Sequence, residues 1–207
     1  MIAIVDYGVG NLFSLRSSFA FIGHEALVTG DRNEILSADR VILPGVGAFG
    51  DAADKLRATG LDETVREAAR RGKPLLGICL GMQLLFDEGE EFGVHRGLGL
   101  IPGRVVSMRP AVPEALKLPQ IGWNGLHLKK PHPLFREIRE GDQVYFVHSF
   151  HGTDCEESLL ATTEYGAEIT AAVGRDNVMG CQFHPEKSGK FGLKILKAFA
   201  ETEDFVC

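Results

Sequence analysis

Three short apolar runs constrain the fold of this chain more than any other feature of its sequence. They comprise residues 2–5, 41–43 and 74–78. Continuous apolar runs of this length are typical of strands that are buried on both faces of a parallel sheet. Because neighbouring parallel strands must be joined by a crossover, we expect helices between these runs.

The segments between the runs carry helix signals. Apolar residues recur at helical spacing over residues 12–22, where Asn11 can cap the helix and Gly23 can end it. Residues 51–71 predict a second, polar-faced helix that Gly72 closes. Strands that alternate with helices in this way indicate right-handed crossover units and a parallel sheet.

The second half of the chain, from about Leu98, has a different pattern. Gly, Pro and Asn separate short runs that predict strands at residues 104–108, 125–128, 144–150, 159–163, 169–173 and 178–183. We expect these strands to pair antiparallel, and a last helix, capped by Ser188, to run to Ala200. The sequence thus predicts a mixed three-layer α/β fold, a mainly parallel sheet flanked by helices with an additional antiparallel layer. One domain over residues 1–207 is expected, with active residues at the carboxyl ends of the parallel strands.

Charge and cysteine content narrow the functional class. A net charge of −6 provides no basic stripe, which argues against nucleic-acid binding and against attachment to a membrane surface. No export signal or membrane helix is expected, because no apolar stretch reaches the roughly 20 residues that a spanning helix needs. Cys79, Cys155, Cys181 and Cys207 lack the spacing of a disulfide framework. We therefore expect reduced thiols and a cytoplasmic location.

Cys79 lies in the sharpest local motif, Gly77-Ile78-Cys79-Leu80-Gly81, between a predicted strand and the helical run 80–86. This pattern is typical of a nucleophile elbow, in which a tight turn exposes the nucleophile and glycines permit close packing. A helix N-terminus also stabilises a thiolate, the reactive form of cysteine. The alternative is a buried structural thiol, the commoner fate of a lone cysteine. The strand-turn-helix context favours the nucleophile.

His184 and Glu186 follow the predicted strand 178–183, with Pro185 between them. In an extended chain, residues two apart point to the same side, so their side chains can meet. Glu186 could then hold the imidazole of His184 in one tautomer while the other ring nitrogen takes the thiol proton. A lone histidine is more often structural, but this pair beside an elbow favours a catalytic set.

The loop at residues 44–50, Pro-Gly-Val-Gly-Ala-Phe-Gly, contains a literal Gly-x-Gly-x-x-Gly. A dinucleotide site would also need an acidic residue near the end of the next strand, where this chain has Cys79. The peptide N–H groups of such a loop can instead point into a site and, with the N–H of Leu80, form an oxyanion hole. No cofactor is therefore expected.

Two aromatic-rich segments remain. His148 and His151 could suggest a metal, but residues three apart on a strand face opposite sides, and no cysteine or carboxylate lies at ligand spacing. We expect no metal site and interpret this segment as a pocket edge. Trp123 could be a core residue, although its Gly and Asn neighbours predict a loop, where an exposed Trp would be a contact anchor.

These motifs resemble a known family along almost the whole chain. The elbow and the His-Pro-Glu segment resemble the class I glutamine amidotransferases generally. The motif at residues 6–12, the segment Gly122-Trp123-Asn124 and the pair Lys187-Ser188 narrow the resemblance to the glutaminase subunits of imidazole glycerol phosphate synthase, from histidine biosynthesis. The residues that carry the resemblance are 6–12, 44–49, 77–86, 121–124, 145–149 and 182–188.

The resemblance implies the class I glutamine amidotransferase fold and a triad of Cys79, His184 and Glu186. This triad would hydrolyse L-glutamine to L-glutamate and ammonia through a γ-glutamyl thioester. It also implies a (β/α)₈ cyclase subunit as partner, which uses the ammonia. The implied glutamine contacts are Gly45, Gln83 and Ser149, the implied oxyanion hole is Leu80 with Val46 or Gly47, and the implied partner side is Trp123, Asn124 and Tyr145.

Three other functions stay open. A free-standing cysteine hydrolase would take its acid from the first strand, where Asp6 is the candidate, although Glu186 already serves the histidine. A regulatory subunit without catalysis conflicts with an intact triad. A paralogue that feeds ammonia to a surface-sugar amidotransferase could be nearly identical in this half, so the partner alone separates the two.

Overall fold

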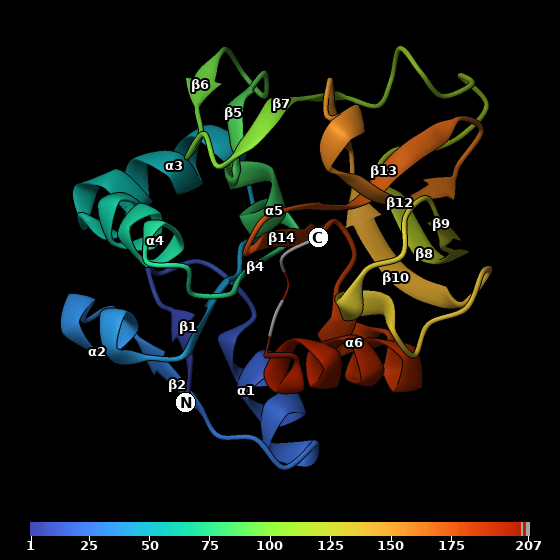
Figure 1. The fold of residues 1–207 in the computed structure, drawn as a ribbon. Helices are drawn as coiled ribbons and strands as arrows, with labels where there is room; N and C mark the ends of the chain where they lie inside the picture. The colour runs from blue at the N-terminus through green and yellow to red at the C-terminus, as the bar shows by residue number, and fades with distance from the viewer. Residues whose placement is uncertain (204, 206–207) are drawn as a thin grey trace.

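The computed structural model describes residues 1–203 and 205 and is built around one eight-stranded sheet (Figure 1). The strand order is β2-β1-β3-β4-β14-β13-β12-β9. The first five of these pair parallel and the remainder antiparallel. Their bounds are β1 Ile2–Val5, β2 Ala26–Thr29, β3 Arg40–Leu43, β4 Leu75–Ile78, β14 Val178–Cys181, β13 Glu168–Arg175, β12 Leu159–Glu164 and β9 His127–Leu128.

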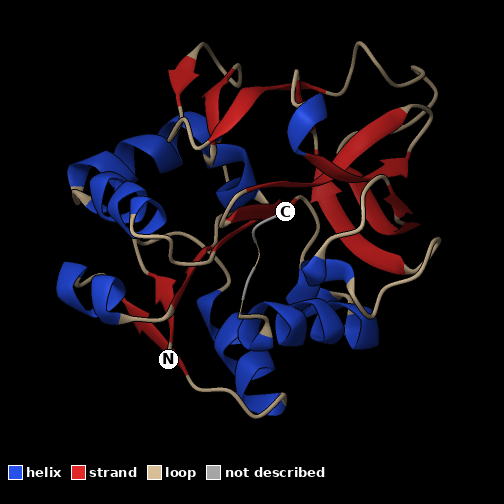
Figure 2. Cartoon of the chain, viewed as in Figure 1, coloured by secondary structure: helices blue, strands red, loops and turns tan. Residues whose placement is uncertain are grey.

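Helices cover both faces of the parallel part of the sheet (Figure 2). Successive residues of a strand point to opposite faces, so Ala3 and Val5 pack in one apolar cluster with α3 and α4, whereas Ile2 and Ile4 pack in another with α1 and α6. The helices are α1 Leu12–Phe21, α2 Arg32–Ser37, α3 Phe49–Ala58, α4 Leu61–Arg70, α5 Leu80–Leu84 and α6 Gly189–Glu201, with short 3₁₀ turns η1 Pro133–Phe135, η2 Glu156–Ser158 and η3 Pro185–Lys187.

Two smaller sheets complete the fold. One pairs β8 (Gln120–Gly125) antiparallel with β10 (Gln143–His148). The other has the order β11-β7-β5-β6. Its strands are β11 Phe150–Thr153, β7 Ile101–Ser107, β5 Phe86–Gly89 and β6 His95–Arg96. The predicted three-layer α/β fold, with a mainly parallel sheet between helices and additional antiparallel strands, is confirmed.

Several predicted elements of the first half were wrong in detail. The sequence pattern missed β2 and α2, because β2 is a short edge strand that is mostly half-buried. The single helix predicted over 51–71 is two helices that break at Gly60, whose φ of 70° is incompatible with a continuous helix. The helical run 80–86 ends at Leu84, and Phe86 begins β5 instead. Asn11 precedes α1, but its side chain makes no capping hydrogen bond.

The second half departs from prediction in its pairing. The predicted strand 125–128 is divided between β8 and β9, and 144–150 is divided between β10 and β11. Strand β14 was predicted antiparallel, but it pairs parallel with β4 and antiparallel with β13, so it joins the two halves of the main sheet. Ser188 precedes α6 but caps no helical N–H with its side chain. Cys207 lies outside the described residues.

None of the helices in residues 1–203 combines the length and apolar composition that crossing a lipid bilayer requires.

Candidate active site

The candidate site forms where three adjacent strands end. Strands β3, β4 and β14 are neighbours in the main sheet and pair parallel, so their carboxyl ends meet at one edge (Figure 1). The glycine loop follows β3, Cys79 follows β4, and His184 follows β14 after two residues. This edge is where the sequence predicted the active residues to lie.

Cys79 sits on a strained turn between β4 and α5. Its φ of 54° and ψ of −112° are a backbone conformation that non-glycine residues rarely adopt. Flanking glycines make the turn possible by close packing: a Cβ at Gly81 would lie 1.8 Å from the carbonyl oxygen of Leu43, and a Cβ at Gly77 would lie 2.7 Å from the carbonyl oxygen of Gly81. The sequence motif therefore folds as the predicted elbow.

His184 and Glu186 meet behind the nucleophile. The Nδ1 of His184 lies 2.8 Å from Oε1 of Glu186, and both side chains are almost fully buried. The contact arises from the 3₁₀ turn η3, so the prediction that an extended chain would place them together was wrong in its geometry. The backbone N–H of His184 donates to the carbonyl oxygen of Tyr145 on β10, at 2.9 Å. The segment that carries His184 is thus anchored to a neighbouring strand.

The surroundings of His184 favour its protonated form. Burial by itself would lower the pKa of His184, but the Cys79 and Glu186 side chains outweigh burial and raise the pKa to about 9. Because a carboxylate can only accept, Nδ1 donates to Glu186, and Nε2 is the ring nitrogen left for proton exchange. An imidazole arranged in this way can take a proton from a thiol and hold it.

The glycine loop packs directly on the elbow. A Cβ at Gly45 would lie 2.9 Å from the amide nitrogen of Gly81 and equally close to the hydroxyl of Tyr7. Tyr7 is buried, and its hydroxyl donates to the carbonyl oxygen of Pro44 at 2.8 Å. Burial raises the pKa of Tyr7 well above its usual value, so the hydroxyl remains a donor. Gly47, with a φ of 96°, turns the loop.

A cavity of about 350 Å³ collects most of the predicted residues. Two predicted residues lie outside its lining but next to it: Gly45 packs beneath the loop, and Glu186 lies behind His184. The predicted residues in its lining are Val46, Gly47, Cys79, Leu80, Gln83, Ser149 and His184. The others are Glu91, Pro119, Val147, His148, Phe150 and Lys187.

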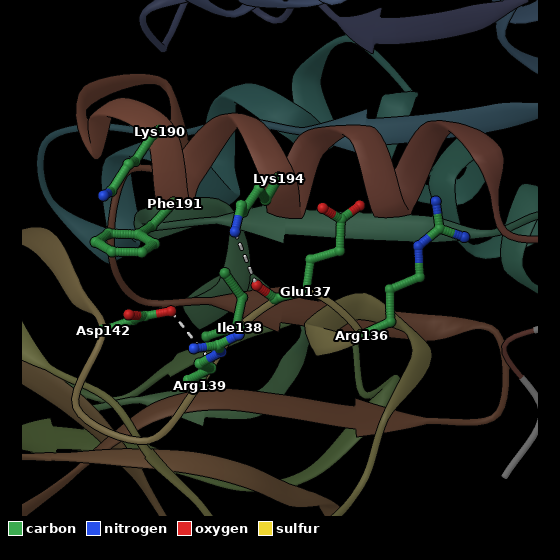
Figure 3. A pocket seen from close by; sticks show the side chains of 8 residues that line it. All are labelled: Arg136, Glu137, Ile138, Arg139, Asp142, Lys190, Phe191 and Lys194. Atoms are coloured by element: carbon green, nitrogen blue, oxygen red, sulfur yellow. Dashed lines mark hydrogen bonds between the residues drawn. The ribbon is translucent and has the colours of Figure 1, made fainter.

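A larger surface hollow of about 580 Å³ lies between α6 and the segment 136–142 (Figure 3). Its lining is mainly charged, and in Figure 3 the ammonium of Lys194 points to the backbone carbonyl of Glu137, 3.3 Å away. Neither cysteine nor histidine lines it. The volume of a hollow therefore does not identify the active site. The smaller cavity is the candidate active site, because Cys79 lines it.

Sequence reasoning assigned no role to Gln182. This residue is fully buried, and its side-chain amide nitrogen lies 3.8 Å from Sγ of Cys79. The signal in the sequence was a polar amide between Cys181 and Phe183 in an otherwise apolar strand, which requires a buried partner. Tyr7 was also missed, since it was noted only as part of a motif.

The two neighbouring histidines lie on different strands, whereas one strand was predicted. His148 ends β10 and His151 belongs to β11. Burial lowers the pKa of His148 to about 4 and also lowers that of His151, so both rings are neutral. Residues 147–150 line the cavity, as expected for a pocket edge. Within the described part of the chain, no three His, Cys, Asp or Glu side chains gather as metal ligands.

The predicted partner residues lie on the β8–β10 sheet. Trp123 is on a strand rather than in the predicted loop, is 59% exposed, and packs edge-on against Tyr145 with ring centroids 4.9 Å apart. Asn124 instead bonds within the chain, accepting from Gln120 at 3.0 Å and donating to the carbonyl of Glu164 at 3.3 Å. Trp123 is thus the available apolar surface of this set.

Comparisons with known proteins agree with this geometry. A relative from Sulfurimonas denitrificans, imidazole glycerol phosphate synthase subunit HisH, is 52% identical over 203 residues, covering 97% of this chain and 98% of the relative. The same-named protein of Syntrophotalea carbinolica is 49% identical over 205 residues, covering 97% of this chain and 100% of the relative.

Solved structures share the fold at low sequence identity. The Thermotoga maritima PurLQS structure aligns with a TM-score of 0.75 at 20% identity and covers 96% of each chain. A glutamine amidotransferase structure aligns with a TM-score of 0.73 at 18% identity, covering 96% of this chain and 98% of that one. The family model for glutamine amidotransferase class-I matches residues 3–202. The chain therefore belongs to the class-I glutamine amidotransferase family.

Proposed function

We propose that this chain is the glutaminase subunit of an imidazole glycerol phosphate synthase and delivers ammonia to a cyclase subunit for histidine biosynthesis. The observation that carries the proposal is a buried His184–Glu186 pair beside a cysteine on a strained elbow. The chain that holds this set is about half identical, over nearly its full length, to relatives named as that synthase's subunit HisH.

In the first half of the reaction, Sγ of Cys79 attacks the side-chain carbonyl carbon of glutamine while Nε2 of His184 takes the thiol proton. The carbonyl oxygen becomes an oxyanion, which the N–H of Leu80 and one N–H of the loop at Val46 or Gly47 stabilise. The C–N bond then breaks, and His184 returns its proton to the leaving nitrogen. Ammonia departs, and a γ-glutamyl thioester remains on Cys79.

In the second half, water attacks the thioester carbonyl while His184 takes one of its protons. The C–S bond breaks, glutamate leaves, and the proton on His184 restores the thiol. Glu186 keeps its hydrogen bond to Nδ1 throughout and stabilises the imidazolium each time it forms.

Glutamine would be held by Gly45, Gln83 and Ser149. Both hydrogens of the Gln83 amide are engaged, by the carbonyl oxygen of Phe150 at 3.1 Å and by Oε1 of Gln182 at 3.0 Å. Toward the cavity, Gln83 can therefore offer only its oxygen, an acceptor suited to the α-ammonium of glutamine. Gly45 acts by leaving room, since its Cβ would clash with the elbow.

The cyclase would dock beside the cavity and contact Trp123, Asn124 and Tyr145. Val46 lines the cavity and is 45% exposed. Exposed Phe92 and Ile121 lie close in sequence to the lining residues Glu91 and Pro119. Exposed apolar side chains near a site favour a surface that a partner covers. The two subunits would then form a heterodimer, in which released ammonia reaches the cyclase before it can diffuse into bulk water.

Two broader assignments accompany the proposal. We infer a single domain over residues 1–207, because the main sheet joins both halves of the chain through the β4–β14 pair. We also infer a cytoplasmic location, because a reducing compartment keeps free thiols reduced. The cysteines at 79, 155 and 181 are all free thiols.

The deciding experiment measures glutamate release by the subunit alone, with the candidate cyclase, and with the cyclase plus its nucleotide ligand. We expect weak release from the subunit alone and strong release from the liganded complex. Full activity in isolation would overturn the idea of a subunit that acts with a cyclase. Stimulation by a surface-sugar amidotransferase, and none by the cyclase, would assign the chain to the paralogous function.

A matched variant separates the two chemistries. Cys79→Ala should abolish glutamine hydrolysis by the complex yet leave the cyclase able to use added ammonium salt, because ammonia bypasses the thiol. Loss of both activities would mean that the substitution disrupts assembly. Retained glutamine hydrolysis would remove Cys79 from its proposed role.

A further inference from the structure

A chain of buried amides runs from the edge of the cavity to the nucleophile. Its members are Gln83 on α5, which is 5% exposed, and Gln182 after β14, which is fully buried. The Nε2 of Gln83 donates to the carbonyl oxygen of Phe150 at 3.1 Å and to Oε1 of Gln182 at 3.0 Å. The Nε2 of Gln182 lies 3.8 Å from Sγ of Cys79.

The donor and acceptor directions in this chain are fixed by chemistry. The carbonyl of Phe150 can only accept, so the group of Gln83 that faces it must be the NH₂. That NH₂ also faces Gln182, which must therefore present its oxygen. The NH₂ of Gln182 is then turned toward the sulfur of Cys79. Rotating either amide by a half-turn would oppose two acceptors or two donors in a buried site.

We propose that Gln182 stabilises the Cys79 thiolate by donating a side-chain N–H to Sγ, and that Gln83 positions it for this task. The proposal rests on the proposed function, because it supplies the reactive form of the nucleophile. A thiolate accepts hydrogen bonds more strongly than a thiol, so the contact favours the charged form. The thiolate of Cys79 and the imidazolium of His184 form an ion pair, in which His184 is the cation. Gln182 adds an uncharged hydrogen-bond donor to the thiolate.

The hydrogen bond from Gln182 offsets the desolvation of a buried Cys79 thiolate. Cys79 is only 7% exposed, and a buried anion that lacks hydrogen bonds loses its water without replacement. Burial raises the pKa of Cys155 to about 11 and also raises that of Cys181. Cys79 differs from these thiols in facing both an imidazole and an amide donor.

The test replaces Gln182 with methionine, which keeps its length and removes its N–H. The full chain is alkylated with iodoacetamide across a pH series, and modification of the Cys79 peptide is followed by mass spectrometry. We expect the midpoint of the Cys79 alkylation profile to rise by about one pH unit in Gln182→Met, the lower end of what a hydrogen bond to a charged group supplies. With glutamine, kcat should fall about tenfold at pH 7 and KM should stay within about twofold, the expectation for lost thiolate rather than lost binding.

The matched control is Gln120→Met. Gln120 is also fully buried, but its Nε2 donates to Asn124 at 3.0 Å and not to the nucleophile. This variant should keep the wild-type alkylation midpoint. An unchanged midpoint in Gln182→Met would overturn the proposal even if its glutaminase activity fell. Because alkylation needs no glutamine, a shifted midpoint in a chain that fails to hydrolyse glutamine even with the liganded cyclase would uphold this inference and reject the proposed function.

A second measurement avoids any change at Gln182. In wild-type protein labelled with ¹⁵N-glutamine, the side-chain NH₂ resonance of Gln182 should titrate with the midpoint of Cys79 alkylation. The resonance should lose this transition in Cys79→Ala. A Gln182 resonance that ignores the thiol titration would contradict the hydrogen bond directly.

Discussion

The backbone at Cys79 stores strain, and a pair of substitutions can measure it. Cys79 has a φ of 54° and a ψ of −112°, which a residue with a Cβ adopts only at a cost. Cys79→Ala keeps the Cβ and therefore keeps the strain. Cys79→Gly removes both. Neither variant carries a thiol at position 79, so any difference in their stability is independent of the chemistry at that sulfur.

The size of the effect follows from three contributions. A non-glycine residue in such a region costs about 1–3 kcal/mol, which glycine would recover. Glycine loses about 0.5–1 kcal/mol more than alanine through unfolded-state entropy, and the missing methyl forfeits about 0.8 kcal/mol of burial. With central values, Cys79→Gly should be more stable than Cys79→Ala by about 0.5 kcal/mol. The sign is the test, because glycine is normally the weaker residue.

Urea unfolding of both variants, followed by circular dichroism, measures the difference. The same pair of residues at Ser17 gives the reference, since Ser17 is exposed in the middle of α1. There, Ser17→Gly should be less stable than Ser17→Ala by about 1 kcal/mol. If glycine were as unfavourable at position 79 as at position 17, the backbone at Cys79 would carry no strain.

Three further outcomes are expected. Glu186→Gln should lower glutaminase kcat by about 10³–10⁴-fold without unfolding the protein, because His184 loses the carboxylate that stabilises its cation; a loss of less than tenfold would remove Glu186 from that role. Cys79→Ala should lower the pKa of His184 from about 9 in an NMR titration, since burial remains while one raising partner is gone, and an unchanged value would contradict this cause. Gly81→Ala would place a Cβ 1.8 Å from the carbonyl oxygen of Leu43, so the elbow must shift by about 1 Å, with a loss of about 100-fold in kcat; wild-type kinetics would show that the contact can relax.

The sequence predicted the buried strands and the elbow correctly, but it did not predict the edge strand, the helix break or the pairing of the last strand. Continuous apolar runs identify the buried strands, and a glycine on either side of a cysteine identifies the elbow, because both patterns report local sterics. The half-buried edge strand β2 carries no such pattern. The break at Gly60 was missed because one glycine inside a polar helix pattern does not disclose its φ. The parallel pairing of β14 depends on β4, a hundred residues away, which periodicity does not report.

The residues of the candidate site also divide into those that the sequence predicted and those that it did not. Cys79, His184 and Glu186 could be named from motifs because their chemistry needs those residue types at those spacings. Gln182 could not be named, since its contact with Cys79 exists only after two distant strands pair. The turn that joins His184 to Glu186 was also predicted incorrectly, because two residues apart can meet in an extended chain or in a 3₁₀ turn.

Tyr145 connects the segment that carries His184 to the outer face that exposes Trp123. Its carbonyl accepts the N–H of His184, its own N–H donates to Oγ of Ser188, and that hydroxyl donates to the carbonyl of His184. The ring of the same residue supports the exposed Trp123. Mutations that reshape this outer face therefore also act on the segment that orients the base. A change of this face to fit a different binding partner would also have to preserve the orientation of the His184 imidazole. This requirement limits how far the sequence of the face can diverge.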